Sequence, residues 1–265
     1  MGLQVVVNFQ VIDESNDWIV VDKPAPLIVH PANRKPEPTL LGGVESLLVY
    51  EIENGACPAV VNRLDRETSG LVLIAKHKAA ARALGMVFAR REVAKEYLAI
   101  VLGWPVGDAW ESGASILRAG ELGPTSIWVR QVEHPAGRVS RTRFCVERRF
   151  ERSEGRFSLV RCFPETGRMH QIRVHLASSG HPVLGDKLYS GDGSEYLKWM
   201  EQGWTPELRE RLLLPRQALH ATRLGVWWDG RWMEWEAALA GDLADFVAGK
   251  AAGEIPGLVI WSRDD

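Results

Sequence analysis

The sequence predicts an α+β fold, in which helices and loops flank a mixed, mainly antiparallel β-sheet. Three observations predict it. Short apolar runs bounded by Gly, Pro, Asn and Asp outnumber helical patterns, regular βαβ units are few, and a strong two-residue hairpin signal, Asp229-Gly230, lies near the C-terminus. The 265 residues are 46% hydrophobic and 25% charged, which is typical of a globular protein and enough chain to bury a large core.

The N-terminal third is expected to contain two strands and a helix. The run 18–21 (WIVV) reads as a strand that ends at Asp22-Lys23-Pro24, and 71–75 (LVLIA) is apolar throughout, as a central strand buried on both faces would be. Residues 77–91 are rich in Ala and place apolar side chains at helical spacing. This pattern predicts an amphipathic helix with a basic outer face.

Further elements follow along the chain. Residues 97–102 and 157–163 read as strands, and about 168–178 as a helix that ends before Gly180. The Trp-rich runs on either side of Asp229-Gly230 form the predicted hairpin. We expect one domain over residues 1–265, with a core from about 11 to 236 and an acidic C-terminal extension over 237–265.

Several classes of protein are excluded by composition. No apolar run approaches the ~18 residues that a membrane helix needs, and the N-terminus lacks the basic start and apolar stretch of a signal peptide. The three cysteines are too scattered for a disulfide framework or a Cys-x-x-Cys metal site. The sequence therefore predicts a soluble, cytoplasmic protein that binds neither membrane nor metal, and we expect a monomer.

Positive charge is concentrated although the net charge is only −2. Between residues 138 and 173 there are ten arginines against four glutamates, and 76–95 carries six basic residues against one acid. Such segments either form ordinary solvated faces or present a local surface for a polyanion. The tail from residue 234 onward is acidic.

The first segment whose side chains could take part in a reaction is 60–70 (VVNRLDRETSG), which leads into the strand at 71–75. Arg63, Asp65 and Glu67 would lie on one side of an extended chain. A carboxylate between arginines is either a structural ion pair or an ionised nucleophile or base. From the residues alone, the structural interpretation is favoured.

The second segment is 165–176 (ETGRMHQIRVHL). On a helix, Arg173 would border the apolar face that carries Met169, so it should be partly buried and need an anionic partner, for which Asp65 is a candidate. His170 and His175 are five residues apart, which does not match the i, i+4 pair of a helical zinc site.

A third segment, Lys95-Glu96-Tyr97, places a tyrosine on a strand directly after a basic helix. On its own this tyrosine would be interpreted as core packing. The chain contains no Gly-x-Ser-x-Gly, no phosphate-binding Gly-x-x-x-x-Gly-Lys-[Ser/Thr] and no Gly-x-Gly-x-x-Gly motif that opens a helix.

Together these segments resemble the RluA family of RNA pseudouridine synthases. Residues 62–70 match its His-Arg-Leu-Asp-x-x-Thr-Ser-Gly signature except at Asn62, 22–31 match its first motif, 95–97 its Lys-x-Tyr, and 167–189 its third motif. The late Leu-His-Ala is also present, at 219–221. The resemblance runs from about Val11 to Glu236 and favours the functional interpretation of Asp65.

The resemblance implies an RNA pseudouridine synthase that isomerises uridines of structured tRNA or rRNA without a cofactor or metal. Asp65 would be the catalytic carboxylate, Arg173 its charge partner, and Tyr97 the ring that stacks on the target base. All three are expected to be catalytic residues.

The same resemblance implies contacts with RNA. Arg63, Arg168, His170 and Gln171 are expected to contact RNA, and the basic segments to bind its backbone. Asn62 and Met169 depart from the usual His and Thr or Ser. The chain also starts close to the first motif, so we expect it to lack the small N-terminal RNA-binding module of many relatives.

Two alternatives differ in class. A non-catalytic RNA-binding protein on the same fold would have no need of Asp65, Tyr97 and Arg173 together. A carboxylate-dependent glycosidase would need a second acid in a matching context, which the sequence does not show.

Overall fold

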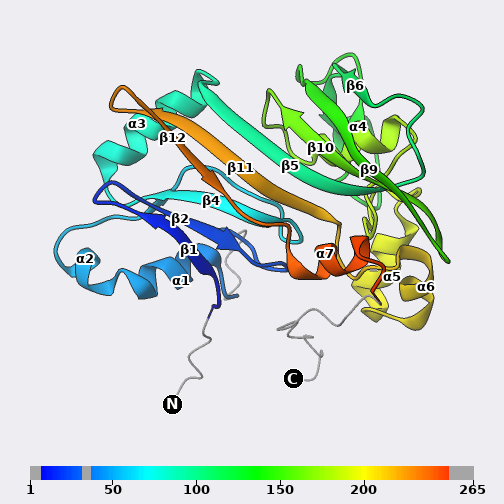
Figure 1. Ribbon diagram of the computed structural model, residues 1–265, viewed down its shortest axis with the longest axis horizontal. Helices are drawn as coiled ribbons and strands as arrows, with labels where there is room; N and C mark the ends of the chain where they lie inside the picture. Colours follow the sequence, from blue (N-terminus) through cyan, green and yellow to red (C-terminus); the bar gives the residue numbers. More distant parts are fainter. Residues whose placement is uncertain (1–6, 32–36, 251–265) are drawn as a thin grey trace.

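A ten-stranded sheet runs through the computed structural model, which describes residues 7–31 and 37–250 (Figure 1). Its path is β1-β2-β4-β11-β5-β10-β9-β6, with β12 paired to β11 and β3 paired to β4. The strands are β1 Gln10–Glu14, β2 Trp18–Lys23, β3 Ala59–Val60, β4 Ser69–Ala75, β5 Val93–Leu102, β6 Ala109–Ser112, β9 Thr142–Arg152, β10 Gly155–Pro164, β11 Leu219–Trp228 and β12 Arg231–Glu236.

Helices and a small second sheet flank the large one. A separate ribbon pairs β7 with β8. These remaining elements are α1 Leu40–Leu47, α2 Val49–Glu53, α3 Lys78–Ala89, β7 Ile116–Arg118, the 3-10 turn Ala119–Glu121, β8 Gln131–Glu133, α4 Gln171–Ser178, α5 Ser194–Gln202, α6 Pro206–Leu212 and α7 Gly241–Val247. The predicted α+β class with a mainly antiparallel, mixed sheet is confirmed.

One close, parallel contact joins the two halves of the large sheet. Strand β4 pairs with β11 in parallel through Ser69 and Gly70, whereas the other ladders of this sheet are antiparallel. Gly70 has φ +111°, and a Cβ there would lie 2.3 Å from the carbonyl oxygen of Ala221. Only glycine fits this close approach of the two strands. The contact therefore fixes where the preceding loop joins the sheet.

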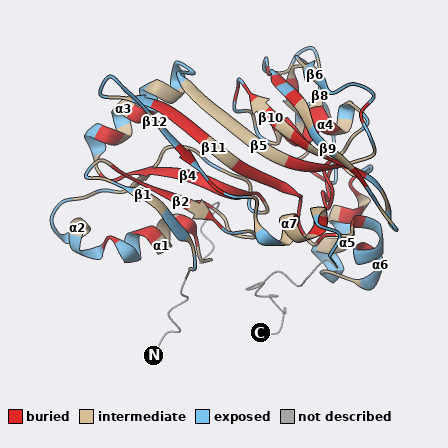
Figure 2. Cartoon of the chain, in the orientation of Figure 1, coloured by how far each residue is buried: buried red, intermediate tan, exposed pale blue. Residues whose placement is uncertain are grey.

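The central strands are covered on both faces, as the uninterrupted apolar run at 71–75 predicts. In β4, Leu71 and Leu73 pack with Leu84 of α3, whereas Val72 and Ile74 pack with α1 on the opposite face. All seven residues of β4 are buried (Figure 2). Successive side chains of β4 point to opposite faces of the sheet, so the strand contributes to an apolar layer on each face.

Most predicted elements are present, with different ends. β5 begins at Val93, four residues before the predicted start, so Tyr97 lies within the strand. Asp229 and Gly230 have φ of +48° and +71° in the predicted hairpin turn. The helix expected from Arg168 begins only at Gln171, and the three residues before it form a loop. Met169 is therefore 41% exposed instead of facing the core.

The chain beyond residue 236 packs into the core, contrary to the expected boundary. Leu243 and Phe246 of α7 are buried in the same cluster as β5 and β10, and Asp242 forms a bidentate ion pair with the buried Arg216. The apolar positions of this short helix are obscured by its acidic composition. The rest of the expected acidic extension, 251–265, lies outside the described residues.

Phe246→Ala tests whether α7 belongs to the core. Phe246 is 1% exposed and stacks edge-on against Phe157, so its removal should lower the free energy of unfolding by about 3–5 kcal/mol. Urea denaturation followed by tryptophan fluorescence measures this. Lys250→Ala, at an exposed ion pair, should change stability by less than about 0.5 kcal/mol; an equal effect of the two substitutions would contradict the packing.

Candidate active site

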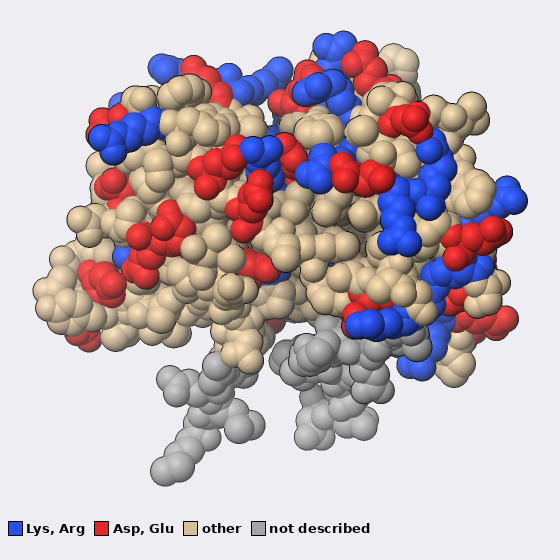
Figure 3. All heavy atoms as spheres, in the orientation of Figure 1, with Lys and Arg blue, Asp and Glu red and all other residues tan. Residues whose placement is uncertain are grey.

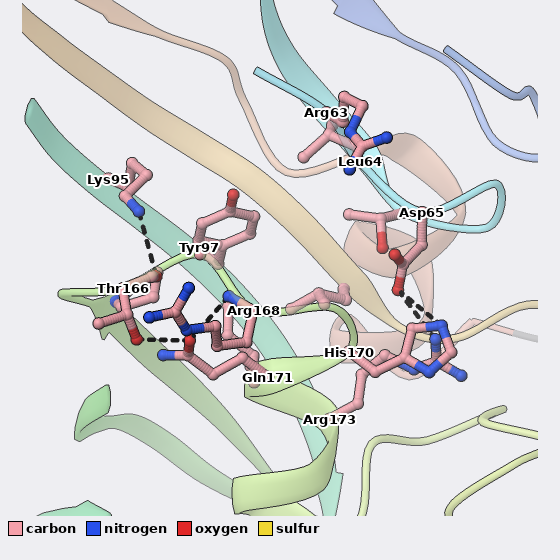
Figure 4. Close-up of a pocket in the computed structure, with 15 residues that line it drawn as sticks. Arg63, Leu64, Asp65, Lys95, Tyr97, Thr166, Arg168, His170, Gln171 and Arg173 are labelled. Atoms are coloured by element: carbon pink, nitrogen blue, oxygen red, sulfur yellow. Dashed lines mark hydrogen bonds and ion pairs between the residues drawn. The ribbon is translucent and has the colours of Figure 1, made fainter. Parts of the chain in front are cut away.

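A pocket of about 120 Å³ opens where three predicted segments converge (Figure 4). The loop before β4 supplies Arg63 and Asp65, strand β5 supplies Lys95 and Tyr97, and the loop and helix over 165–173 close the third side. These segments lie far apart in sequence. The order β4-β11-β5-β10 of the sheet brings their ends together.

Asp65 is held through one of its two carboxylate oxygens. Arg173 Nη1 donates to Asp65 Oδ2 at 2.8 Å, Gln217 Nε2 donates to the same oxygen at 3.4 Å, and His170 Nε2 lies 4.0 Å from it. Within the described residues Oδ1 accepts no hydrogen bond, and the side chain is 30% exposed in the pocket wall. The carboxylate is thus oriented by one oxygen and keeps the other for a ligand.

Arg173 is itself fixed by a second carboxylate. Its Nε and Nη2 donate to the two oxygens of Asp186 at 2.6 and 2.9 Å, and its guanidinium stacks over the Tyr189 ring at 5.0 Å. Asp186 is fully buried and also accepts from the backbone N–H of Leu188. A planar fork that makes three charge-assisted bonds leaves Arg173 little rotational freedom.

These charges keep Asp65 ionised. Burial alone would raise the pKa of the Asp65 carboxyl, but the charge that His170 carries when protonated, the permanent charge of Arg173, and hydrogen bonds from Arg173 and Gln217 hold that pKa below its ordinary value. Burial and then the Arg173 charge lower the pKa of His170 to about 4. His170 is therefore neutral at pH 7, and Arg173 is the permanent cation beside Asp65.

Tyr97 presents a neutral ring to the pocket. Burial, followed by the negative charge of Asp65, raises the pKa of the Tyr97 phenol above its usual range. A phenol that stays protonated is a poor base at pH 7. What the residue offers to a ligand is an aromatic face and an O–H group.

Three of the four residues expected to contact RNA lie where they can reach it. Arg63 is exposed and donates to His30 at 3.2 Å, and Arg168 lines the pocket while its Nε donates to the Val139 carbonyl. His170, at φ +57°, hydrogen-bonds the Tyr189 hydroxyl through Nδ1 and borders Asp65. These three can reach a ligand in the cleft.

Gln171 does not fit its expected role. It is 4% exposed. Its Nε2 donates to the Arg141 carbonyl and Thr142 Oγ1, and its Oε1 accepts from Thr166 Oγ1 and the Arg168 N–H. Both donors and both acceptor positions are used within the protein. Gln171 therefore supports the loop that carries Arg168 instead of contacting RNA.

The expectation that Glu67 shares a side with Asp65 is also wrong. The loop is turned, with the Thr68 N–H donating to the Asp65 carbonyl, and the Glu67 carboxylate points to Lys187 Nζ at 2.7 Å. The Gln217 amide links Thr68 Oγ1 and Asp65. These buried contacts make Glu67 a support of the loop.

Several residues of the site were missed by the sequence reasoning. Asp186 and Gln217 contact Arg173 and Asp65 from distant positions that no local pattern reveals. Lys95 lines the pocket with Tyr97, and its Nζ donates to the Thr166 carbonyl at 3.2 Å. The charged residues between Gly185 and Leu188 in the third motif were the available signal for Asp186.

The two departures from the family pattern have different surroundings. The amide of Asn62 bridges strand β4, donating to the Leu71 carbonyl and accepting from the Leu73 N–H at 2.7 Å. Met169 lines a groove of about 440 Å³ that continues from the pocket past Arg63 and His30. Asn62 therefore fixes the entry of the loop, whereas Met169 faces any ligand in that groove.

The strongest basic segment is largely neutralised. Seven of the ten arginines between 138 and 173 pair with carboxylates, so most of this segment is a network of ion pairs. The 76–95 segment differs, because within the described residues only Lys76 among its cations has a carboxylate partner. On the face that Figure 3 shows, Lys and Arg are interspersed with Asp and Glu.

Among residues 7–31 and 37–250, no group of three or more His, Cys, Asp or Glu side chains is placed to hold a metal ion. In the same part of the chain, no helix is long and apolar enough to cross a membrane.

Three buried or largely buried histidines predict a pH-dependent stability. Burial is the main cause that lowers the pKa of His170 and His220 to about 4, and it lowers that of His175, whereas the unfolded chain binds these protons near pH 6.5. The unfolded state therefore binds more protons between pH 6.5 and 4, so stability falls as the pH falls through this window.

Urea midpoints measured from pH 7 to 4.5 should decrease, and less steeply for His220→Gln. A midpoint that is constant over this range would contradict the neutral burial of these rings.

Comparison with known proteins gives a consistent result. The family model described as RNA pseudouridylate synthase matches residues 17–178. Ribosomal large subunit pseudouridine synthase D of Yersinia pestis is 33% identical over 245 residues, covering 91% of this chain and 70% of that protein. The protein of the same name from Nitrosomonas europaea is 34% identical, with 90% and 64% covered.

Solved structures share the fold. Human RNA Pseudouridylate Synthase Domain Containing 4 has a TM-score of 0.69 at 22% identity, covering 90% of this chain and 92% of that one. Human RNA Pseudouridylate Synthase Domain Containing 1 has a TM-score of 0.64 at 25% identity, with 97% and 100% covered. The resemblance drawn from the motifs is confirmed, and the chain belongs to the RNA pseudouridylate synthase family.

Proposed function

We propose that this protein isomerises uridine to pseudouridine in large-subunit ribosomal RNA, with Asp65 as the catalytic carboxylate. The family makes the reaction class that of an RNA pseudouridine synthase, an isomerase. The names of the relatives favour ribosomal RNA over transfer RNA. A cytoplasmic location and a monomeric state belong to the same proposal.

The reaction rearranges one nucleotide without net gain or loss of atoms. The bond between ribose C1′ and base N1 breaks, a bond between C1′ and C5 forms, and the proton lost from C5 is balanced by the one gained at N1. No redox partner or phosphate donor is required. The protein must supply an ionised group at the nucleotide and must hold the detached base while it turns.

The observation that carries the proposal is the asymmetric binding of the Asp65 carboxylate. Arg173 and Gln217 hold Oδ2, which leaves Oδ1 for the nucleotide as nucleophile or base. Charge at His170 and Arg173, with hydrogen bonds from Arg173 and Gln217, holds the pKa of Asp65 below its ordinary value despite its burial. An oriented and ionised carboxylate is what this chemistry needs.

Tyr97 and the cations of the cleft have complementary roles in the proposal. The Tyr97 ring would stack on the extruded base, since an aromatic face accepts a base at any angle of its turn. Its high pKa makes the phenol a hydrogen-bond donor at pH 7. Arg63 and Arg168, at the pocket walls, would bind the flanking backbone.

Asp65→Asn separates catalysis from binding. Asn keeps the shape of the side chain but not its charge, so the variant should fold and bind RNA while losing at least about 10³-fold in turnover. Tritium release from 5-tritiated uridine transcripts of large-subunit rRNA and of tRNA measures turnover and compares the substrates. The control is Glu210→Gln, at an exposed acid on α6.

Residual turnover of Asp65→Asn within tenfold of wild type would overturn the assignment. Tight RNA binding by the wild-type protein without any tritium release would favour the non-catalytic alternative.

Arg173→Lys tests the charge partner. Lys keeps the charge but cannot reproduce the three-way fork, so the rate at saturating RNA should fall by about 10–100-fold. The pKa of Asp65 should rise, so the acid limb of the pH–rate profile should move to higher pH. The matched control is Arg211→Lys, because Arg211 of α6 also pairs with a carboxylate, that of Glu195 on α5. An unmoved acid limb combined with weaker binding would make Arg173 a phosphate contact.

A further inference from the structure

A second hollow of about 470 Å³ adjoins the Asp65 pocket. It lies between the C-terminal end of α3 and the loop that precedes α4, and it shares Lys95, Gly167 and Arg168 with the pocket. Phe88 lines this hollow and also the groove on the other side. An RNA strand whose nucleotide occupies the pocket has room to continue along this hollow or along that groove.

The hollow gathers cations. Arg91, Lys95 and Arg168 line it, and none of the three has a carboxylate partner among the described residues. The one acid in the wall, Glu165, is already engaged by Arg143 Nε at 3.3 Å. This arrangement contrasts with the neighbouring arginine-rich segment, where most charges are paired.

Lys95 and Arg91 are close enough to repel each other. Burial, and then the charge of Arg91, lowers the pKa of Lys95 to about 8. Among the described residues, Lys95 Nζ makes one hydrogen bond, to the Thr166 carbonyl, although an ammonium group can donate three. An anion between the two side chains would remove the repulsion and use the free donors.

The backbone turns sharply at Arg91. Its N–H donates to the Phe88 carbonyl as α3 ends, and its φ of +62° is unusual for a residue with a side chain. The turn places Arg91 in the wall of the hollow, next to the start of β5. A charged residue that makes no ion pair within the described chain thus occupies a strained backbone position.

We propose that Arg91, Lys95 and Arg168 form a subsite for one phosphodiester of the substrate RNA, next to the nucleotide held at Asp65. The subsite rests on the proposed function in that its ligand is the same RNA. Lys95 stands two residues before Tyr97 on β5 and lines both the Asp65 pocket and this second hollow. A phosphate bound there would fix the backbone beside the base that stacks on Tyr97.

The test replaces single phosphodiesters of a substrate RNA hairpin with uncharged methylphosphonates, one position at a time around the target uridine. At one position within about two nucleotides of the target, the neutral linkage should weaken binding to the wild-type protein about tenfold. For Arg91→Ala and for Lys95→Gln, the same linkage should cost less than about twofold, because the contact is already lost.

The control is Arg209→Ala, which removes an exposed charge on α6. In this variant, the neutral linkage at that position should weaken binding as much as it does in the wild-type protein. Arg91→Ala should also lower the slope of log K against log salt concentration by about the amount of one phosphate contact. If the neutral linkages weaken RNA binding by Arg91→Ala as much as binding by the wild-type protein at every position, the subsite does not exist.

The outcome is separable from that of the proposed function. Position-specific penalties that vanish in Arg91→Ala would support the subsite even if no pseudouridine forms. Pseudouridine formation with unchanged penalties would support the function and refute the subsite.

Discussion

The site depends on one guanidinium held between two carboxylates. Arg173 reaches from α4 to Asp65 in the loop before β4 and to Asp186 in the segment after α4. Two anions and one cation in a buried place remain ionised only as a unit, because each would be costly to bury alone. Asp186 fixes where Arg173 stands, and Arg173, together with Gln217, binds one oxygen of Asp65 and helps to hold the pKa of that carboxyl low. The chemistry proposed for Asp65 therefore begins with a structural interaction that lies deeper than the pocket.

The loop that carries Asp65 is secured by further buried charges. Lys187 binds Glu67, Arg216 donates to the Glu67 carbonyl and pairs with Asp242 of α7, and Lys23 Nζ donates to three backbone carbonyls, one of which belongs to Arg66. Each contact joins the loop to a different part of the chain. A short segment without regular hydrogen bonding is made rigid in this way.

Much of the fold follows from local pattern. The apolar run of β4, the helix α3 and the Asp229-Gly230 hairpin were predictable because periodicity and turn chemistry act over a few residues. The start of α4 was not, since the hydrogen bonds of Gln171 to Thr166 and Arg141 hold the preceding residues in a loop. Tertiary contacts likewise decide that most arginines from 138 to 173 are paired. Asp186 and Gln217 could not be assigned from spacing, because their partners lie on other segments.

The most direct measurement of the central claim is a titration of the Asp65 carboxyl carbon by ¹³C NMR in the RNA-free protein, assigned by comparison with Asp65→Asn. If Arg173 compensates for burial, the midpoint lies below the ordinary aspartate value of about 3.9, and Asp65 is fully ionised at pH 7. A midpoint above that value would mean that burial prevails over Arg173. Asp65 would then not be the pre-ionised carboxylate on which the account of this site depends.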